Sequence, residues 1–270
     1  MKKILLIVFI LSFAVRMLTL NTNLFFASEQ GRDLKVVFDI VNNQKLTLIG
    51  PRTSIEGIFH GVLYYYLMIP PFLIGTGSPM VIMIFFLLWQ SLGAVFLYQF
   101  LNDAVGKRCA LIGSLMYSTS FGLIVYSRWF SHPPLIIPFS ILLFWSLYKI
   151  SIKQDWLNIS ISVVSWWSIF HFDLVVSLFF LSGIIIYFFW QKIKLEKISR
   201  IFIPVISLLF LAPYLLFEAR HGFLMLSGFR NFLSASHNGA FDVVGILRHL
   251  FYRYTSEIGD IIGPDLSIIP

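Results

Sequence analysis

Ionisable side chains are concentrated in residues 27–66, although most of the sequence is apolar. This stretch begins ASEQGRDL, in which Glu29 and Asp33 are four residues apart and Arg32 precedes Asp33. On a helix these three side chains share one face near the amino-terminal end, where the macrodipole favours carboxylates. A carboxylate in a partly dehydrated position can act as a general base, and an arginine can bind an anion. We therefore take Glu29, Arg32 and Asp33 as candidate catalytic residues; for Glu29 the alternative is a solvated acid at a helix start.

Further polar residues occur in segments between long apolar runs, and we take them as candidate substrate-binding residues. They are Arg52, His60, Tyr64, Arg128, His132, His171, Glu218 and Arg220. No two histidines have the i, i+4 spacing of a helical metal pair, so no metal site is predicted and structural hydrogen bonding is the simpler interpretation. Arg128 beside Trp129 equally suits a side chain that extends from a membrane boundary into water.

A helix beginning near Ser28, which suits the N-cap position, must position these groups. Its apolar stripe is expected at Leu34, Val37, Phe38 and Val41, which follow the i, i+3, i+4, i+7 rule. Such a pattern predicts a short amphipathic helix on a membrane surface.

The composition excludes a water-soluble domain. Hydrophobic residues make up 58% and charged residues 12% of the chain, against about 25% charged residues in soluble domains. The formal charge of +7 comes from Lys and Arg in short loops, which is typical of a membrane-orientation signal rather than of nucleic-acid binding. One cysteine, Cys109, excludes an internal disulfide or a cysteine-based metal site.

Apolar runs predict an all-α polytopic membrane protein with about seven transmembrane helices and a long first outer loop that carries surface-lying helices. The runs are near 4–20, 80–101, 109–126, 134–150, 156–172, 174–190 and 201–217. A further run, 58–74, is interrupted by Pro70 and Pro71, which predicts a surface or re-entrant helix followed by a break.

With this topology the basic clusters share one side, which the positive-inside rule assigns to the cytoplasm together with the amino terminus. The clusters are Lys2 and Lys3, Lys107 and Arg108, Lys149 and Lys153, and Lys192, Lys194, Lys197 and Arg200. We expect a plasma-membrane protein with a transmembrane catalytic core at 1–217, an outer loop at 21–79, and an outer-face segment at 218–270 containing a short helix near 243–254.

Several motifs resemble those of membrane glycosyltransferases of the GT-C superfamily, in particular prokaryotic relatives of protein O-mannosyltransferases and of the aminoarabinose transferase that modifies lipid A. The motifs are Glu29-Gln30-Gly31-Arg32-Asp33, Gly50-Pro51, Gly61-Val62-Leu63-Tyr64-Tyr65-Tyr66, Tyr126-Ser127-Arg128-Trp129 with Pro133, and Phe217-Glu218-Ala219-Arg220-His221-Gly222-Phe223. One departure is Glu29-Gln30, where such relatives usually have Asp-Glu.

The resemblance implies transfer of a sugar, with inversion, from a polyprenyl phosphate to a lipid, glycan or protein acceptor on the outer face. Glu29 would then be the general base, and Arg128, Arg220 or Arg52 would bind the carrier phosphate. No cofactor is predicted, although a divalent cation stays open. The alternatives are a transporter or lipid flippase and a non-catalytic subunit. Transporters place ionisable groups and broken helices near the bilayer midplane, often in repeats, whereas the helix centres here are nearly free of charge and no repeat is visible.

Overall fold

The computed structural model describes residues 2–22, 24 and 26–235, and within them the regular elements are helices. In chain order they are α1 (Lys2–Met17), α2 (Ser28–Asn43), α3 (Leu63–Ile74), α4 (Pro79–Ala104), α5 (Lys107–Thr119), α6 (Phe121–Ser127), the 3₁₀ helix η1 (Pro133–Leu135), α7 (Ile136–Ile152), α8 (Trp156–Phe172), α9 (Leu174–Trp190), α10 (Lys197–Arg220) and α11 (Leu224–Ala235). The helix expected near 243–254 lies outside the described residues.

Within the described residues, 3 helices are long and apolar enough to cross a membrane: Pro79–Ala104, Pro133–Ile152 and Ser199–Arg220. The count rises to 4 if α5 and α6, which are bent by 56° at their junction, form one broken span. The expected spans at 4–20, 156–172 and 174–190 appear as helices of 16 or 17 residues, shorter than the roughly 20 residues that cross a bilayer. The structure therefore has the expected helical, membrane-protein character with three to four candidate spans.

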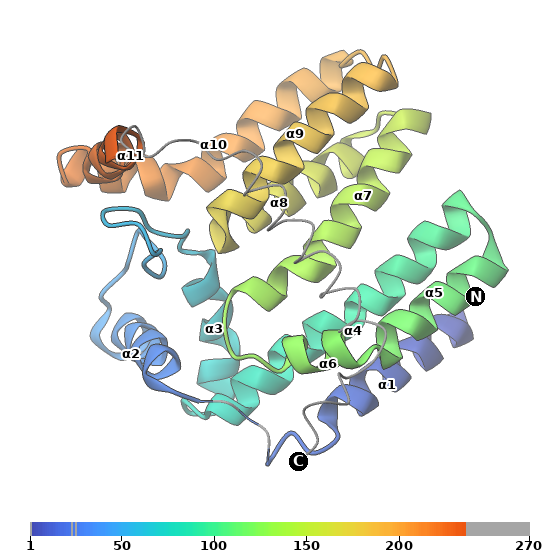
Figure 1. Ribbon diagram of the computed structural model, residues 1–270, viewed down its shortest axis with the longest axis horizontal. Coiled ribbons are helices and arrows are strands. Elements are labelled where there is room, and N and C mark those ends of the chain that lie inside the picture. Colours follow the sequence, from blue (N-terminus) through green and yellow to red (C-terminus); the bar gives the residue numbers. More distant parts are fainter. Residues whose placement is uncertain (1, 23, 25, 236–270) are drawn as a thin grey trace.

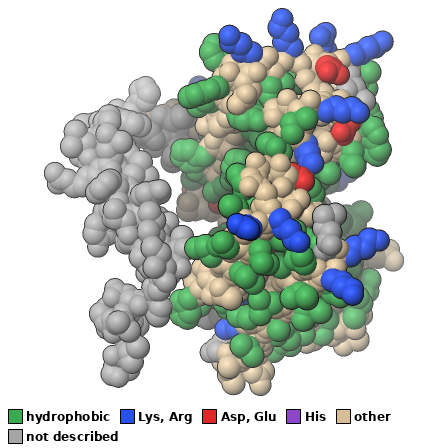
Figure 2. All heavy atoms as spheres, turned by 90° about the vertical axis from the view of Figure 1, so that its right-hand side faces the viewer, with side chains coloured by type: hydrophobic (Ala, Val, Ile, Leu, Met, Phe, Trp, Pro, Cys, Tyr) green, Lys and Arg blue, Asp and Glu red, His purple; other side chains and the backbone are tan. Residues whose placement is uncertain are grey.

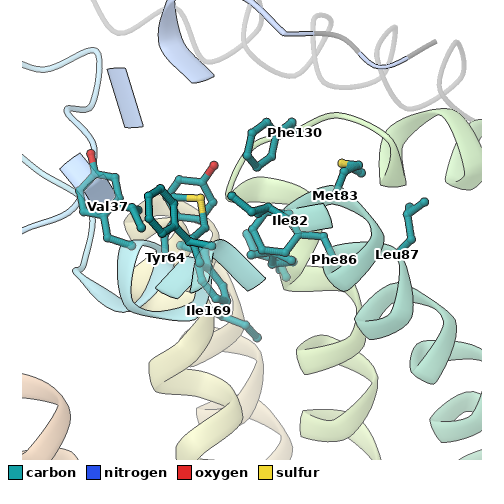
Figure 3. Packing of buried hydrophobic residues seen from close by; sticks show 14 of the residues in the cluster. Val37, Tyr64, Ile82, Met83, Phe86, Leu87, Phe130 and Ile169 are labelled. Carbon is teal, nitrogen blue, oxygen red and sulfur yellow. The ribbon is translucent and has the colours of Figure 1, made fainter. Parts of the chain in front are cut away.

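The helices form a layered bundle in which α4 packs on α1, α5 and α7, α7 packs on α8, and α8 packs on α9 and α10 (Figure 1). Helices α2 and α3 lie together at one end of this bundle. The larger buried cluster is at that end, where Val37 of α2, Tyr64 of α3 and Phe86 of α4 face one another (Figure 3). This cluster fixes the positions of α2 and α3 relative to the bundle.

Helix α2 is present as expected, and its buried face includes most of the predicted stripe together with two polar residues. The residues it buries are Gln30, Asp33, Val37 and Ile40, whereas Phe38, predicted to be on the stripe, is 49% exposed. The N-cap is Ala27 rather than Ser28, and the Gln30 side chain accepts a hydrogen bond from the Ala27 N–H at 3.0 Å. Val37 is buried and Leu34 and Val41 pack against the core, so the stripe prediction is wrong for Phe38 and lacks the buried polar residues of this face.

Helix α3 continues through Pro70 and Pro71 and ends at Ile74, so the expected break at the prolines is wrong. The helix has 12 residues, or roughly 18 Å, which is too short to cross about 30 Å of hydrocarbon. A proline removes one backbone hydrogen bond from a helix. In α3, Pro71 and Phe72 are buried in the interior, and the helix continues past both prolines.

The amino terminus of α1 and the α4–α5, α7–α8 and α9–α10 connections all lie on the right-hand side of Figure 1. Figure 2 faces this side and shows Lys and Arg side chains spread over it, with few carboxylates. Helices α2 and α3 lie toward the opposite side. The basic clusters thus share one end of the molecule.

Candidate functional site

Asp33 is the acidic side chain that α2 turns into the protein, and it is 5% exposed. Its Oδ1 accepts hydrogen bonds from the Tyr65 hydroxyl at 3.1 Å and from Arg32 Nε at 3.0 Å. Its other carboxylate oxygen accepts no hydrogen bond from the described residues. Burial raises the pKa of Asp33, and the hydrogen bonds from Arg32 and Tyr65 only partly oppose this. One oxygen is therefore held in place while the other is free to accept a proton.

Two histidines and a tyrosine form a second polar group beside Tyr65. The ring centroids of His60 and His132 are 4.4 Å apart, and those of Tyr64 and His132 are 5.6 Å apart. Tyr64 in turn contacts Tyr65 at 5.7 Å. The Tyr64 hydroxyl and the Nδ1 atoms of both histidines are buried and have no hydrogen-bond partner among the described residues. Three neighbouring side chains thus hold polar atoms that a ligand could engage.

Burial disfavours the charged form of both histidines. Burial and, to a smaller extent, the nearby His60 lower the pKa of His132 to about 3, although a hydrogen bond to the Phe172 backbone opposes the shift. Burial also lowers the pKa of His60, although the charge of Asp173 works in the other direction. Neutral imidazoles can donate and accept hydrogen bonds but do not attract anions.

The loop between α2 and α3 places His60 beside His132. His60 exchanges backbone hydrogen bonds with Gly50 and Pro51 at 2.8 and 2.9 Å, which closes the loop on itself. The next residue, Gly61, donates its N–H to the carbonyl of His171 at 2.8 Å. A Cβ on Gly61 would lie 2.7 Å from the His171 Cα, so this approach of loop to helix α8 requires glycine.

His171 has a structural role at the contact between this loop and α8. Its Nδ1 accepts a hydrogen bond from the Leu63 N–H at 3.4 Å, and its Nε2 donates to the carbonyl of Phe210 at 3.1 Å. The ring is 2% exposed, and both nitrogens are occupied. His171 therefore links α3, α8 and α10 and has no nitrogen left for a substrate.

Glu29 lies in the first turn of α2 but is exposed. It has no hydrogen bond or salt bridge among the described residues, although its charge acts on Arg32 and Asp33. The two carboxylates that the sequence placed on one face thus have different environments. Asp33 is buried beside Tyr65, while Glu29 stays exposed in the first turn of α2.

Arg128 and Glu218 both stabilise helix ends. Arg128 donates hydrogen bonds to the carbonyls of Val15, Arg16 and Leu18 at the end of α1. The Glu218 carboxylate accepts hydrogen bonds from the N–H groups of Met225 and Leu226 in the first turn of α11.

Arg52 and Arg220 are exposed and have no hydrogen-bonding side-chain contact among the described residues. A ring contact of 5.8 Å between Phe59 and Phe217 joins the loop that carries Arg52 to the end of α10 that carries Arg220. Both guanidinium groups are therefore available for a ligand.

Sequence reasoning missed Arg16, whose side chain is 0% exposed. It donates hydrogen bonds to Ser12 Oγ at 2.6 Å and to the carbonyls of Tyr117 and Ser118, and it lies over the Tyr117 ring. An arginine near the end of an apolar run is the signal that could have identified it. These contacts join α1 to α5 and do not reach the Asp33 group.

Among the described residues, no group of three His, Cys, Asp or Glu side chains could hold a metal ion. The arrangement instead offers a half-satisfied carboxylate, neutral hydrogen-bonding groups, aromatic faces and the guanidinium of Arg32, whose side chain is 50% exposed. Comparison with protein-family models, curated proteins and solved structures found no match. The assignment of function therefore depends on the geometry of this site.

Proposed function

We propose that the chain is a membrane glycosyltransferase that moves a sugar from a polyprenyl phosphate to an acceptor hydroxyl or amine, with Asp33 as the general base. The observation that carries the proposal is the Asp33 carboxylate, buried at the start of a short helix with one oxygen fixed and the other unpartnered. A fixed, desolvated carboxylate of this kind suits proton abstraction near neutral pH. This moves the base from Glu29, the residue that the motif resemblance favours, to Asp33 one turn later.

In the proposed reaction the acceptor oxygen or nitrogen forms a bond to the anomeric carbon. The bond between that carbon and the phosphate oxygen breaks, and its electron pair leaves with the polyprenyl phosphate, which becomes a monoester. The acceptor proton passes to the free oxygen of Asp33. Tyr65 and Arg32 keep the carboxylate oriented during this step. Atoms and charge balance without a further co-reactant.

The neighbouring residues suit a sugar. Its hydroxyl groups need uncharged donors and acceptors, which His60, His132 and Tyr64 provide through atoms without partners in the described structure. Of the neighbouring rings, Phe86 lies next to Tyr64, with ring centroids 6.1 Å apart (Figure 3).

For the carrier phosphate we propose Arg32 together with Arg52 or Arg220. Arg32 is next to the proposed base and half exposed, and a planar guanidinium binds phosphate through two parallel hydrogen bonds. Arg128 is less suitable because its donors already bind the end of α1. We further propose that the site faces outward, that α1, α8 and α9 also cross the plasma membrane, and that the basic end is cytoplasmic.

A transfer assay with the reconstituted full chain and defined polyprenyl-phosphate sugars tests this proposal. Asp33→Asn should lower the rate by about 10² to 10⁴-fold, the usual loss for a general base. Glu29→Gln is the matched control, and it should retain most of the activity because Glu29 is exposed. The opposite result would return the base to Glu29, and no transfer by the unaltered chain from any of the sugars would overturn the proposal.

The alternative of a transporter or flippase has one observation in its favour, the 56° break between α5 and α6. Broken helices in transporters line a binding site near the bilayer midplane. In this chain the buried arginine next to that break, Arg16, is in the last turn of α1 and is occupied by carbonyl and hydroxyl groups. Movement of a labelled lipid between the two leaflets of proteoliposomes, without sugar transfer, would favour this alternative.

A further inference from the structure

A groove of about 840 Å³ lies between α9 and α10. Helices α9 and α10 both pack on α8, so Val163, Trp166 and Trp167 of α8 form its floor. Most of its lining is apolar, and Ile185 and Phe189 on the α9 wall are 60% and 87% exposed. An apolar groove on a membrane-protein surface is suited to an acyl chain.

Only one end of this groove is charged. The α9–α10 connection closes that end and contributes Lys192 and Lys194 to the lining. Both lysines are exposed and have no salt bridge among the described residues. Their charges therefore have no partner within the described part of the chain.

The backbone that carries these lysines is held in place by Gln154, which lies in the α7–α8 connection. Gln154 Nε2 donates to the Lys194 carbonyl at 2.7 Å, and its Oε1 accepts from the Glu196 N–H at 3.1 Å and from Ser199 Oγ at 2.8 Å. The basic end of the groove is thus a fixed feature of the fold.

We propose that this groove binds one anionic phospholipid, with its phosphate at Lys192 and Lys194 and an acyl chain along α9. Lys192 follows shortly after α9, and the lining residue Leu181 is 9 positions before Trp190, the last residue of this helix, which is roughly 14 Å of helix. This matches the depth of one leaflet, about half of the 30 Å hydrocarbon core. Charge complementarity selects an anionic headgroup over a zwitterionic one.

This lipid is separate from the proposed sugar carrier. Asp173, whose charge acts on His60, caps the start of α9, whereas Lys192 follows its end. The helix between them has 17 residues, or roughly 25 Å. Loss of lipid binding would therefore leave the proposal for Asp33 untouched, and loss of transfer would leave the lipid site untouched.

Native mass spectrometry of the full chain in mixed micelles with phosphatidylglycerol or phosphatidylcholine tests the proposal. We expect one phosphatidylglycerol to be retained in preference to phosphatidylcholine. The double variant Lys192→Gln/Lys194→Gln should bind it about 30-fold more weakly, since each lysine near a lipid phosphate contributes about a factor of five. The matched control is Lys153→Gln/Lys197→Gln, which removes the same charge from exposed positions on the same side but outside the groove, and it should retain the lipid.

A second variant tests the acyl chain. Leu181→Trp adds bulk to the groove wall and should lower phosphatidylglycerol retention without altering the lysines. Inorganic phosphate alone should not displace the bound lipid. Equal retention of both lipids, equal loss in the control double variant, or full displacement by inorganic phosphate would each overturn the proposal. Variants are compared only where their elution in gel filtration matches that of the unaltered chain.

Discussion

Replacement of Arg128 separates a structural role from the phosphate-binding role that its motif suggests. The last four carbonyls of a helix have no partner within the helix, and Arg128 donates to the carbonyls of Val15, Arg16 and Leu18 at 3.1, 3.1 and 2.6 Å. A cation at this position also opposes the negative end of the α1 dipole. We therefore expect Arg128 to act on stability first.

The size of the effect follows from the number of bonds lost. A hydrogen bond from a charged group contributes about 1.5–3 kcal/mol when buried, and about 1 kcal/mol each is appropriate for a half-buried side chain. Arg128→Ala should then lower the free energy of unfolding by about 3 kcal/mol. Arg128→Lys keeps the charge and one donor position, so it should cost about 2 kcal/mol.

Thermal unfolding in detergent, followed by tryptophan fluorescence, measures this effect. For a chain of this size each kcal/mol corresponds to about 2–4 °C, so Arg128→Ala should lower the melting temperature by about 6–12 °C. Arg220→Ala is the matched control: Arg220 is exposed and makes no side-chain bond among the described residues, so its change should stay within about 2 °C. An unchanged melting temperature together with weakened carrier binding in Arg128→Ala would refute the structural role.

Three further predictions concern Asp33, Gly61 and Cys109. Burial raises the pKa of Asp33, so the stability gained from the protonated carboxyl is present below the ordinary pKa of aspartate and is lost as the pH rises through the raised pKa. Asp33→Asn should therefore be at least as stable as the natural chain at pH 7. It should also flatten the change in melting temperature between pH 4 and 7. Gly61→Ala should lower the free energy of unfolding by about 1–3 kcal/mol, because the added Cβ forces α8 away from the loop. Gly183 has open space around it, so Gly183→Ala should not lower stability in the same unfolding assay. Cys109 is exposed, so a membrane-impermeant maleimide should label it after permeabilisation but not in intact cells; labelling in intact cells would contradict the proposed orientation.

The sequence predicts the helical character well because long apolar runs leave few alternatives. It does not predict where those runs bend. The run 109–126 is continuous in hydrophobicity, yet the structure divides it at Ser120 into α5 and α6. Such a bend depends on the packing of α5 and α6 against α1 and α4, which no local pattern records.

The role of Arg128 was similarly outside the reach of local patterns. Its partners precede it by 110 to 113 positions, and a snorkelling arginine and a helix-capping arginine have the same sequence neighbourhood. His171 is a comparable case, because its partners are on α3 and α10. For such residues the chemistry is set by tertiary contacts, so sequence reasoning could identify them as important without assigning their roles.

Glu29 and Asp33 show where the decisive information lies. They are one helical turn apart and nearly equivalent in sequence terms, since either can favour the start of a helix. Their difference arises because α2 packs on α3, which places Tyr65 beside Asp33 and leaves Glu29 in solvent. A carboxylate that keeps its water shell gains nothing from its surroundings, whereas one that loses it must be held by specific donors. Arg32 and Tyr65 supply those donors to a single oxygen of Asp33, and an asymmetry of this kind leaves the other oxygen available for a proton.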